Sequence, residues 1–346
     1  MTDMKTAVLL LAHGTPNRLS EMTEYLAHVT AGRPMPTHIV EELQHRYAAI
    51  GLREDPLPEG PPLTRWTLRQ GELLEDEVCT TVYVGMRNWH PFIADVVAQM
   101  KSDGITHATV LCLAPQNSRT STGLYRRALE KALTETPSPA FTFDFIAGWA
   151  GEPLLAEAFA ENLAPALAAA RTTDATAPVL FTAHSVPCRT IMSATDLGAP
   201  RPDSGTWVST ESPGQPPADG IQNYGVSTTP DPYPVECKQT AAAVAKLSGL
   251  SDKDWFFAFQ SQGIAGAPWI GPTVEDTLTA LAAAGHKAVV IQPIGFLCDH
   301  VEILYDIDVN FRDFAAPLGL TVVRAASLND SPTLIRAIAH VLEGVA

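Results

Sequence analysis

Residues 177–187, Ala-Pro-Val-Leu-Phe-Thr-Ala-His-Ser-Val-Pro, decide the fold because they join an apolar run to a histidine turn. Residues 7–16, Ala-Val-Leu-Leu-Leu-Ala-His-Gly-Thr-Pro, repeat this arrangement near the start of the chain. Short apolar runs that end in turn residues are typical of buried strands in a parallel sheet. His13 and His184 lie roughly 170 residues apart, so the repeat spans half of the chain.

A helix and a strand also recur at a similar offset, which indicates a duplicated α/β domain. They span residues 91–102 and 107–115 in the first half, and residues 272–284 and 287–293 in the second. Because predicted strands alternate with helices throughout, each half should form a parallel sheet covered by helices on both faces. We expect domains at 1–170 and 171–346, with a cleft between them at the carboxyl ends of the strands.

The composition limits the class of protein. A chain of 346 residues with 46% hydrophobic content is long enough for two well-cored domains. Its net charge of −15 argues against nucleic acid or an anionic membrane as a partner, because phosphate binding needs concentrated Lys and Arg. Residues 1–14 hold only about six consecutive apolar residues, too few for a signal peptide or a membrane span. We therefore expect a cytoplasmic protein without stable membrane insertion.

The cysteines predict no metal cluster. They are scattered along the chain, form no CxxC pair and number five: Cys79, Cys112, Cys188, Cys237 and Cys298. An odd count without compact spacing is typical of reduced thiols rather than a disulfide framework. An iron–sulfur cluster or a structural zinc site is not expected, since no spacing forms a ligand set.

Residues 188–233 have no counterpart in the first half of the chain. They are rich in Pro, Gly, Ser, Thr and Asp and show little periodicity, so they read as an insertion with loop character. The insertion leaves directly from the His184 turn. Two interpretations stay open: a lid over the cleft, or a surface loop without a role.

The stretch 293–310, PIGFLCDHVEILYDIDVN, follows a predicted strand and starts a helix with many acids. We expect this helix to span His300–Phe314, with Asp299 as its N-cap. Its polar stripe at i, i+4 and i+8 is Glu302, Asp306 and Asn310, and its apolar face is Val301, Leu304, Tyr305 and Phe311. The stripe is either a solvated surface or a site, and its position after a strand favours a site.

The residues alone indicate metal or proton handling and no more. His13 and His184 are each either satisfied structural residues or proton acceptors and metal ligands. For His184 the second interpretation is favoured by Glu302 and Asp306, two acids that follow another strand of the same half. The chain has no GxGxxG or P-loop, and neither a GxSxG elbow nor an HExxH helix. These absences leave nucleotide-binding, serine hydrolase and zinc protease functions without a motif.

Several motifs together resemble those of the ferrochelatase family. They are Leu10–Pro16 (LLAHGTP), Gly85–Pro91 (GMRNWHP), Phe181–Pro187 (FTAHSVP), Phe259–Gln262 (FQSQ), Trp269–Pro272 (WIGP) and Pro293–Asp308 (PIGFLCDHVEILYDID). The resemblance covers nearly the whole chain except 188–233. It implies two similar Rossmann-like, chelatase-type domains with the active site in the cleft between them.

The resemblance also implies the reaction, which is insertion of Fe²⁺ into a porphyrin in haem biosynthesis, a lyase activity. The AHGTP and RNWHP motifs look most like those of monoderm bacteria whose enzymes act on coproporphyrin III, and protoporphyrin IX is the alternative substrate. Beyond the substrate iron, no cofactor is implied. A monomer is expected, with transient contact to other haem-pathway enzymes.

By resemblance, His184 accepts a pyrrole proton or binds iron, and Glu302 is its acidic partner. Asp306 extends the metal or proton path, and His13 is a metal ligand and substrate contact. Other positions similar to those near the substrate are Arg33, Arg46, Tyr47 and Tyr125. The guanidinium groups suit propionate carboxylates. The alternative is that Arg33 and Arg46 are ordinary surface charges.

Three positions depart from the family pattern. His13 stands where close relatives often carry Tyr or another aromatic residue, and it could be an axial ligand. Asn310 replaces an expected third acid, and Asn88 lies where some relatives have His. Two other functions therefore stay open: a non-catalytic haem or tetrapyrrole carrier, and a cobalt chelatase of the same fold.

Overall fold

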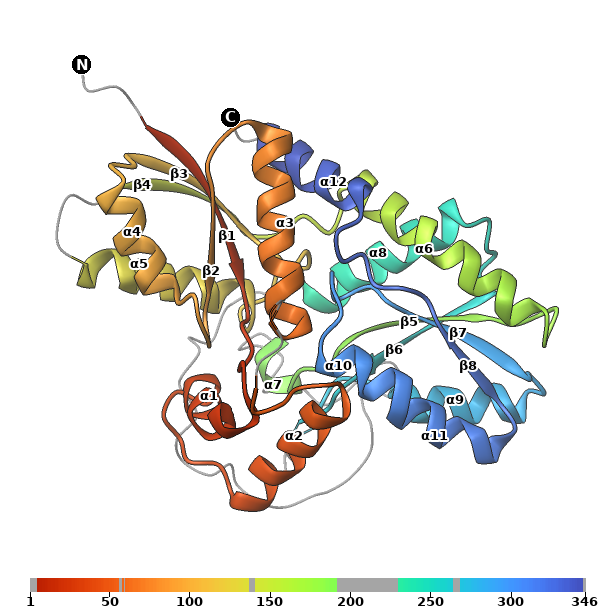
Figure 1. Cartoon of the computed structure of the whole chain (residues 1–346). Coiled ribbons are helices and arrows are strands. Elements are labelled where there is room, and N and C mark those ends of the chain that lie inside the picture. Colours follow the sequence, from red (N-terminus) through yellow and green to blue (C-terminus); the bar gives the residue numbers. More distant parts are fainter. Residues whose placement is uncertain are drawn as a thin grey trace.

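The computed structural model describes residues 5–55, 58, 60–136, 141–191, 230–263 and 268–344. Within them the chain forms two parallel four-stranded sheets (Figure 1). The first has the order β2-β1-β3-β4, with β1 Thr6–Ala12, β2 Val82–Met86, β3 His107–Cys112 and β4 Thr142–Ile146. The second has the order β6-β5-β7-β8, with β5 Val179–His184, β6 Trp255–Gln260, β7 Ala288–Pro293 and β8 Thr321–Arg324. We call these sheets with their helices the first and second lobes.

The two lobes share one topology, which confirms the predicted fold class. In each, the first strand along the chain is central and its neighbours occupy equivalent places. An isolated parallel bridge also recurs at matching positions, Met86 with Phe92 and Phe259 with Thr273. Because all strands of a lobe are parallel, the turns after β1 and β5 lie at the same kind of sheet edge.

The helices cover both faces of each sheet (Figure 1). In the first lobe they are α3 Pro62–Val78, α4 Ile93–Ser102 and α5 Thr122–Glu135. Those on the second sheet are α6 Pro153–Arg171, α8 Tyr233–Leu247, α9 Val274–Ala283, α10 Val301–Leu304, the π-helix Asp306–Phe311, α11 Arg312–Ala315 and α12 Pro332–Glu343.

One hydrophobic core joins the lobes. Strand β1 alternates, so that Leu9 and Leu11 face α4 and α5 while Val8 and Leu10 face the other way. The second set belongs to a cluster that continues through α6, α8 and α12 into the second sheet. Helix α12 contacts both α3 and α6, and α6 packs on β7 and β8. The domain boundary at residue 170 stays a prediction.

Two helices form a separate unit beyond the end of β1. They are α1 Met22–Val29 and α2 Thr37–Ala49. Their apolar residues pack with Leu52 and Trp89 in a small cluster, against which Val301 of the second lobe also packs. This unit therefore lies between the histidine turn of β1 and helix α10.

The acidic helix differs from its predicted form. Its N-cap is His300 rather than Asp299, whose carboxylate instead accepts hydrogen bonds from the side chains of Arg324, Ser327 and Asn329. The π-helix widens the turn, as the hydrogen bond from the Asn310 amide to the Tyr305 carbonyl shows. The buried face of this segment is Ile303, Ile307, Phe311 and Ala315. The predicted packing of Leu304 and Tyr305 on that face is wrong, because both side chains are only half-buried and lie outside this cluster.

Both ends of the predicted insertion have structure. Residues Cys188–Ile191 form the short helix α7, and α8 begins at Tyr233. Asp231 is buried, and its carboxylate accepts a hydrogen bond from the Arg119 amide of the first lobe. Residues 192–229, on which the choice between lid and surface loop depends, lie outside the described residues. None of the helices in the described part of the chain is both long and apolar enough to cross a membrane.

Gly295 sets the spacing of the two strand ends that carry the site. A Cβ atom on Gly295 would lie 2.9 Å from the Cβ of Ala183, the residue before His184. We expect Gly295→Ala to lower the free energy of unfolding by about 1–3 kcal/mol, because the strand ends must move apart. Urea unfolding measures this loss. Gly151→Ala is the matched control, since nothing lies within 4 Å of its added Cβ, and equal stability of the two variants would contradict the prediction.

Candidate active site

A cavity of about 380 Å³ lies between the lobes. Its first-lobe wall includes His13 and Tyr125, and its second-lobe wall includes His184, Phe296 and Glu302. The histidines follow β1 and β5, and Glu302 follows β7 through the turn 294–300. The predicted cleft at the carboxyl ends of the strands is therefore present, with both histidine turns on it.

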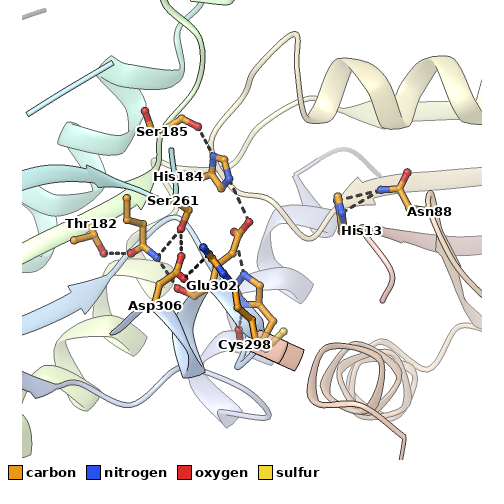
Figure 2. Close-up of polar contacts among 12 residues, drawn as sticks. His13, Asn88, Thr182, His184, Ser185, Ser261, Cys298, Glu302 and Asp306 are labelled. Atoms are coloured by element: carbon orange, nitrogen blue, oxygen red, sulfur yellow. Dashed lines mark hydrogen bonds and ion pairs between the residues drawn. The ribbon is translucent and has the colours of Figure 1, made fainter. Parts of the chain in front are cut away.

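His184 and Glu302 form the central ion pair of this cavity. The Nε2 atom of His184 lies 3.2 Å from a carboxylate oxygen of Glu302, and each side chain is about one third exposed, at 34% and 32%. The other ring nitrogen, Nδ1, is in hydrogen-bond contact with the Ser185 carbonyl oxygen. Figure 2 shows both contacts. Both ring nitrogens face acceptors, so the geometry favours the doubly protonated imidazolium.

The electrostatics of the pair agree with this geometry. Burial alone lowers the pKa of His184, but the Glu302 charge and hydrogen bond outweigh it and raise the pKa from 6.5 to about 9. Burial raises the pKa of Glu302, but the His184 charge outweighs it and holds the pKa well below its ordinary value. At neutral pH the pair is an imidazolium and a carboxylate.

His300 is a second histidine on Glu302, and our sequence analysis missed it. Its Nε2 lies 3.4 Å from the other carboxylate oxygen of Glu302, and its Nδ1 lies 3.0 Å from the Cys298 carbonyl oxygen. It lies directly before the helix and two residues from Glu302. This closeness in the sequence is the signal that could have identified His300 as a partner of Glu302. Glu302 therefore bridges two imidazoles, from β5 and from its own helix start.

His13 lies on the first-lobe wall of the cavity, where Figure 2 shows it beside Asn88. Its Nε2 lies 3.1 Å from the Tyr25 hydroxyl, and both its ring nitrogens lie 3.2 Å from Nδ2 of Asn88. Burial, together with the Arg87 charge, lowers the pKa of His13 from 6.5 to about 4. His13 is thus a neutral imidazole held by Tyr25 and Asn88, whereas His184 is charged.

Asp306 lies behind the pair rather than on the cavity wall. Its carboxylate accepts a 2.5 Å hydrogen bond from the Ser261 hydroxyl and lies 3.6 Å from the Arg46 guanidinium. Burial, opposed by the Ser261 hydrogen bond, raises the pKa of Asp306 from 3.8 to about 6. Next to Ser261, Gln260 donates a 2.7 Å hydrogen bond to the Glu302 carbonyl oxygen. Gln260 and Ser261, at the end of β6, thus hold Glu302 and Asp306.

The candidate substrate contacts divide into two groups. Tyr47 and Tyr125 are buried and line the cavity. Arg33 is exposed, and its side chain donates to the Thr30 carbonyl. Arg46 pairs with Glu42 and Asp306 and lies 5.5 Å from the centre of the Tyr305 ring. The structure thus brings the two tyrosines to the cavity, whereas the two arginines lie outside its lining, and all four substrate roles stay predictions.

Tyr233 supports the histidine from behind. Its hydroxyl donates a 2.8 Å hydrogen bond to the His184 carbonyl oxygen. It is buried at the start of α8, and the adjacent Glu236 accepts a hydrogen bond from the Asn117 amide of the first lobe. We assigned Tyr233 to the insertion, and no pattern in the sequence links it to His184. The contact arises only where α8 packs between the lobes.

The predicted metal-binding residues do not form a preassembled metal site. Within the described ranges, no three His, Cys, Asp or Glu side chains are arranged to hold a metal ion. His13 lies on the wall opposite His184 and Glu302, and Asp306 lies behind them. Their metal roles stay predictions.

The fold and cavity define a two-lobed α/β protein with an imidazole–carboxylate site between its lobes. Comparison with known proteins gives the family, because the ferrochelatase family model matches residues 5–345. A ferrochelatase of Acidobacterium capsulatum is 52% identical over 98% of this chain and 94% of its own length. One of Herpetosiphon aurantiacus is 36% identical over 98% and 99%. A coproporphyrin III ferrochelatase of Halalkalibacterium halodurans is 29% identical over 99% and 98%. The chain belongs to the ferrochelatase family.

The pair should titrate as a unit. Because the pKa of His184 is raised in the folded protein, the stabilisation it supplies is complete below pH 6.5 and is lost as the pH rises through about 9. In Glu302→Gln the burial remains and the neighbouring charge is gone, so we expect the His184 pKa to fall well below about 9. Histidine NMR titration measures both values, with surface His340 as the internal control. A His184 midpoint near 9 in the variant would refute the assignment.

Tyr233→Phe removes only the hydroxyl that holds the His184 carbonyl. We expect stability to fall by about 1–3 kcal/mol, because a buried acceptor loses its donor, and turnover to fall severalfold with KM unchanged. Thermal unfolding and steady-state kinetics measure the two effects. Tyr83→Phe is the matched control, since its hydroxyl donates to Asp103 in the first lobe, outside the cavity lining. Equal turnover in the two variants would remove the positioning role.

Proposed function

We propose that the protein inserts Fe²⁺ into coproporphyrin III within the cavity between the lobes. The observation that carries this proposal is the charged His184–Glu302 pair, which lines the same cavity as the neutral imidazole of His13. Membership of the ferrochelatase family supports the reaction. The likeness to a coproporphyrin III ferrochelatase supports the choice of porphyrin, and protoporphyrin IX is the competing substrate.

The reaction needs groups that move protons and groups that approach iron. Two pyrrole N–H protons must leave as the iron sheds water and binds the ring nitrogens. An imidazolium cannot accept a proton, so His184 must first release its own, and an approaching dication lowers its pKa for this purpose. Glu302 lies within 3.2 Å to receive that proton. Glu302 releases that proton toward Asp306, and His184 then accepts the pyrrole protons one at a time, each of which leaves by the same route.

His13 is suited to the metal rather than to the protons. Its low pKa keeps one ring nitrogen unprotonated at neutral pH, which a metal ligand requires. Tyr25 and Asn88 hold the ring, so it can approach iron from the first-lobe side of a bound macrocycle. Aromatic walls from Tyr47, Tyr125 and Phe296 suit the faces of a flat ring, and binding energy there can bend it to expose its nitrogens.

Asp306 is placed to extend the proton path beyond Glu302. With a pKa of about 6 it exchanges protons near neutral pH, and Arg46 and Ser261 already hold its carboxylate.

We propose that the protein needs no cofactor beyond its substrate Fe²⁺. We also propose that it acts as a cytoplasmic monomer that contacts other haem-pathway enzymes only transiently.

The direct test is anaerobic incubation of purified protein with Fe²⁺ and either coproporphyrin III or protoporphyrin IX, followed by absorbance. We expect insertion into both to be measurable and kcat/KM to be higher for coproporphyrin III. His184→Ala should lower kcat by about 10²–10⁴-fold, because the proton acceptor is lost, while porphyrin affinity stays unchanged. His340→Ala is the control, since His340 pairs with Glu152 outside the cavity lining.

The outcomes separate the competing functions. No metalloporphyrin from the wild-type protein would refute the enzyme. Tight haem binding through His13 without turnover would favour a carrier, and insertion of Co²⁺ into a corrin precursor alone would favour a cobalt chelatase. A higher kcat/KM for protoporphyrin IX would refute only the choice of porphyrin.

A further inference from the structure

Two buried glutamines of the first lobe line the active-site cavity, and neither has a part in the proposed proton transfer. Gln70 lies on α3 and is fully buried, and Gln116 follows β3 and is 2% exposed. Helix α3 lies where the lobes meet, in contact with α12 (Figure 1). Buried amide groups need hydrogen-bond partners, and both side chains donate to main-chain carbonyls of the second lobe.

Gln116 holds the start of the turn 294–300, which leads from β7 to the acidic helix. Its Nε2 atom donates a 3.2 Å hydrogen bond to the Ile294 carbonyl oxygen. The amide of Ile294 donates in turn to the Thr182 carbonyl oxygen of β5, at 2.8 Å. The start of the turn is therefore tied on one side to the strand that carries His184 and on the other side to the first lobe.

Gln70 holds the other end of this turn through Asn329. Its Nε2 atom donates a 2.6 Å hydrogen bond to the Asn329 carbonyl oxygen. The Asn329 amide donates to the Leu297 carbonyl oxygen at 2.9 Å, and the Asn329 side chain bonds to both the amide and the carboxylate of Asp299. Asn329 has a left-handed backbone, with a φ of 48°, which asparagine tolerates better than most residues. One residue thus links α3 to the turn.

The position of this turn decides where the acid of the ion pair lies. The turn ends at His300, two residues before Glu302. The Glu302 carboxylate lies 3.2 Å from Nε2 of His184, and the attraction between the two charges weakens as this distance grows. A misplacement of about 1 Å is enough to cost an enzyme much of its rate. Contacts that fix the turn therefore act on the chemistry without touching the substrate.

We propose that Gln70 and Gln116 are positioning residues, which hold the turn 294–300 from the first lobe and so keep Glu302 against His184. The effect on turnover rests on the proposed function, whereas the effect on the ion pair does not. Because both amides come from the opposite lobe, the same contacts also join the two walls of the cavity.

The variants Gln70→Met and Gln116→Met test the proposal, because methionine has a similar volume and cannot donate a hydrogen bond. In each variant we expect the His184 titration midpoint, measured by histidine NMR, to fall from about 9 by about one pH unit as Glu302 moves away. We expect kcat to fall about tenfold and KM to stay within about twofold, because the lost donor binds a carbonyl and not the substrate.

The variant Asn329→Gly tests the link between α3 and the turn separately. Glycine accepts the left-handed backbone and keeps the carbonyl oxygen that Gln70 binds, but it removes the side chain that bonds to Asp299. We expect the His184 midpoint and kcat to fall in the same direction as in the methionine variants. If Gln70→Met does not fold, this variant and Gln116→Met decide the proposal.

The matched control is Gln99→Met, since the Gln99 amide donates to the exposed Asp103 carboxylate outside the cavity lining. Thermal unfolding shows which variants are folded under the assay conditions. A lowered melting temperature with the His184 midpoint and kcat unchanged would overturn the positioning role. A raised KM with kcat unchanged would also overturn it, because that result marks a substrate contact. If the wild-type protein inserts no iron, the proposed reaction fails, and the His184 midpoints still decide the role of the glutamines.

Discussion

The charge pair of His184 and Glu302 constrains the rest of the site, because two opposite charges in a partly enclosed cavity need fixed partners. Each partner comes from a different strand end, and each is anchored by main-chain contacts. Tyr233 holds the His184 carbonyl and Gln260 holds the Glu302 carbonyl. The surroundings of one histidine keep it charged and those of the other keep it neutral. One residue type is thus an imidazolium on one wall of the cavity and an unprotonated imidazole on the other.

Duplication explains why the histidines lie on one cavity, and divergence explains why they differ. Both follow the central strand of equivalent sheets. The side chain of His13 contacts two neutral side chains, Tyr25 and Asn88. The side chain of His184 instead contacts an acid, Glu302, from the helix after β7. Asp306, four residues after Glu302, is held by Ser261 and Arg46 behind the pair. The two acids of the stripe therefore have separate surroundings.

The sequence predicted the two-lobed fold and the placement of His13, His184, Glu302, Tyr47 and Tyr125 at the cavity. Buried parallel strands and short turns carry strong local signals, so the fold and the two histidine turns were readable. Tyr47 and Tyr125 were placed by the family resemblance rather than by a local pattern. The buried face of the acidic helix was not readable, because Ile303, Ile307 and Phe311 follow the same i, i+4 spacing as the polar stripe beside them, so the pattern fits more than one face. His300 and Tyr233 were missed because their roles depend on contacts made at a helix start and between α8 and the end of β5. Arg33 and Arg46 have the expected charge, but packing directs them to Thr30 and Asp306 instead of the cavity lining.

The hydrophobic cluster that runs from β1 through α6 and α12 into the second sheet has a further meaning. Lobes that share an interior cannot swing apart as a hinged pair does without exposing that interior to water, at a cost that grows with the area uncovered. The width of the active-site cavity is consequently set in part by the volumes of core side chains that lie far from any reacting atom. The size of the rings that fit the cavity therefore depends partly on the packing of the core.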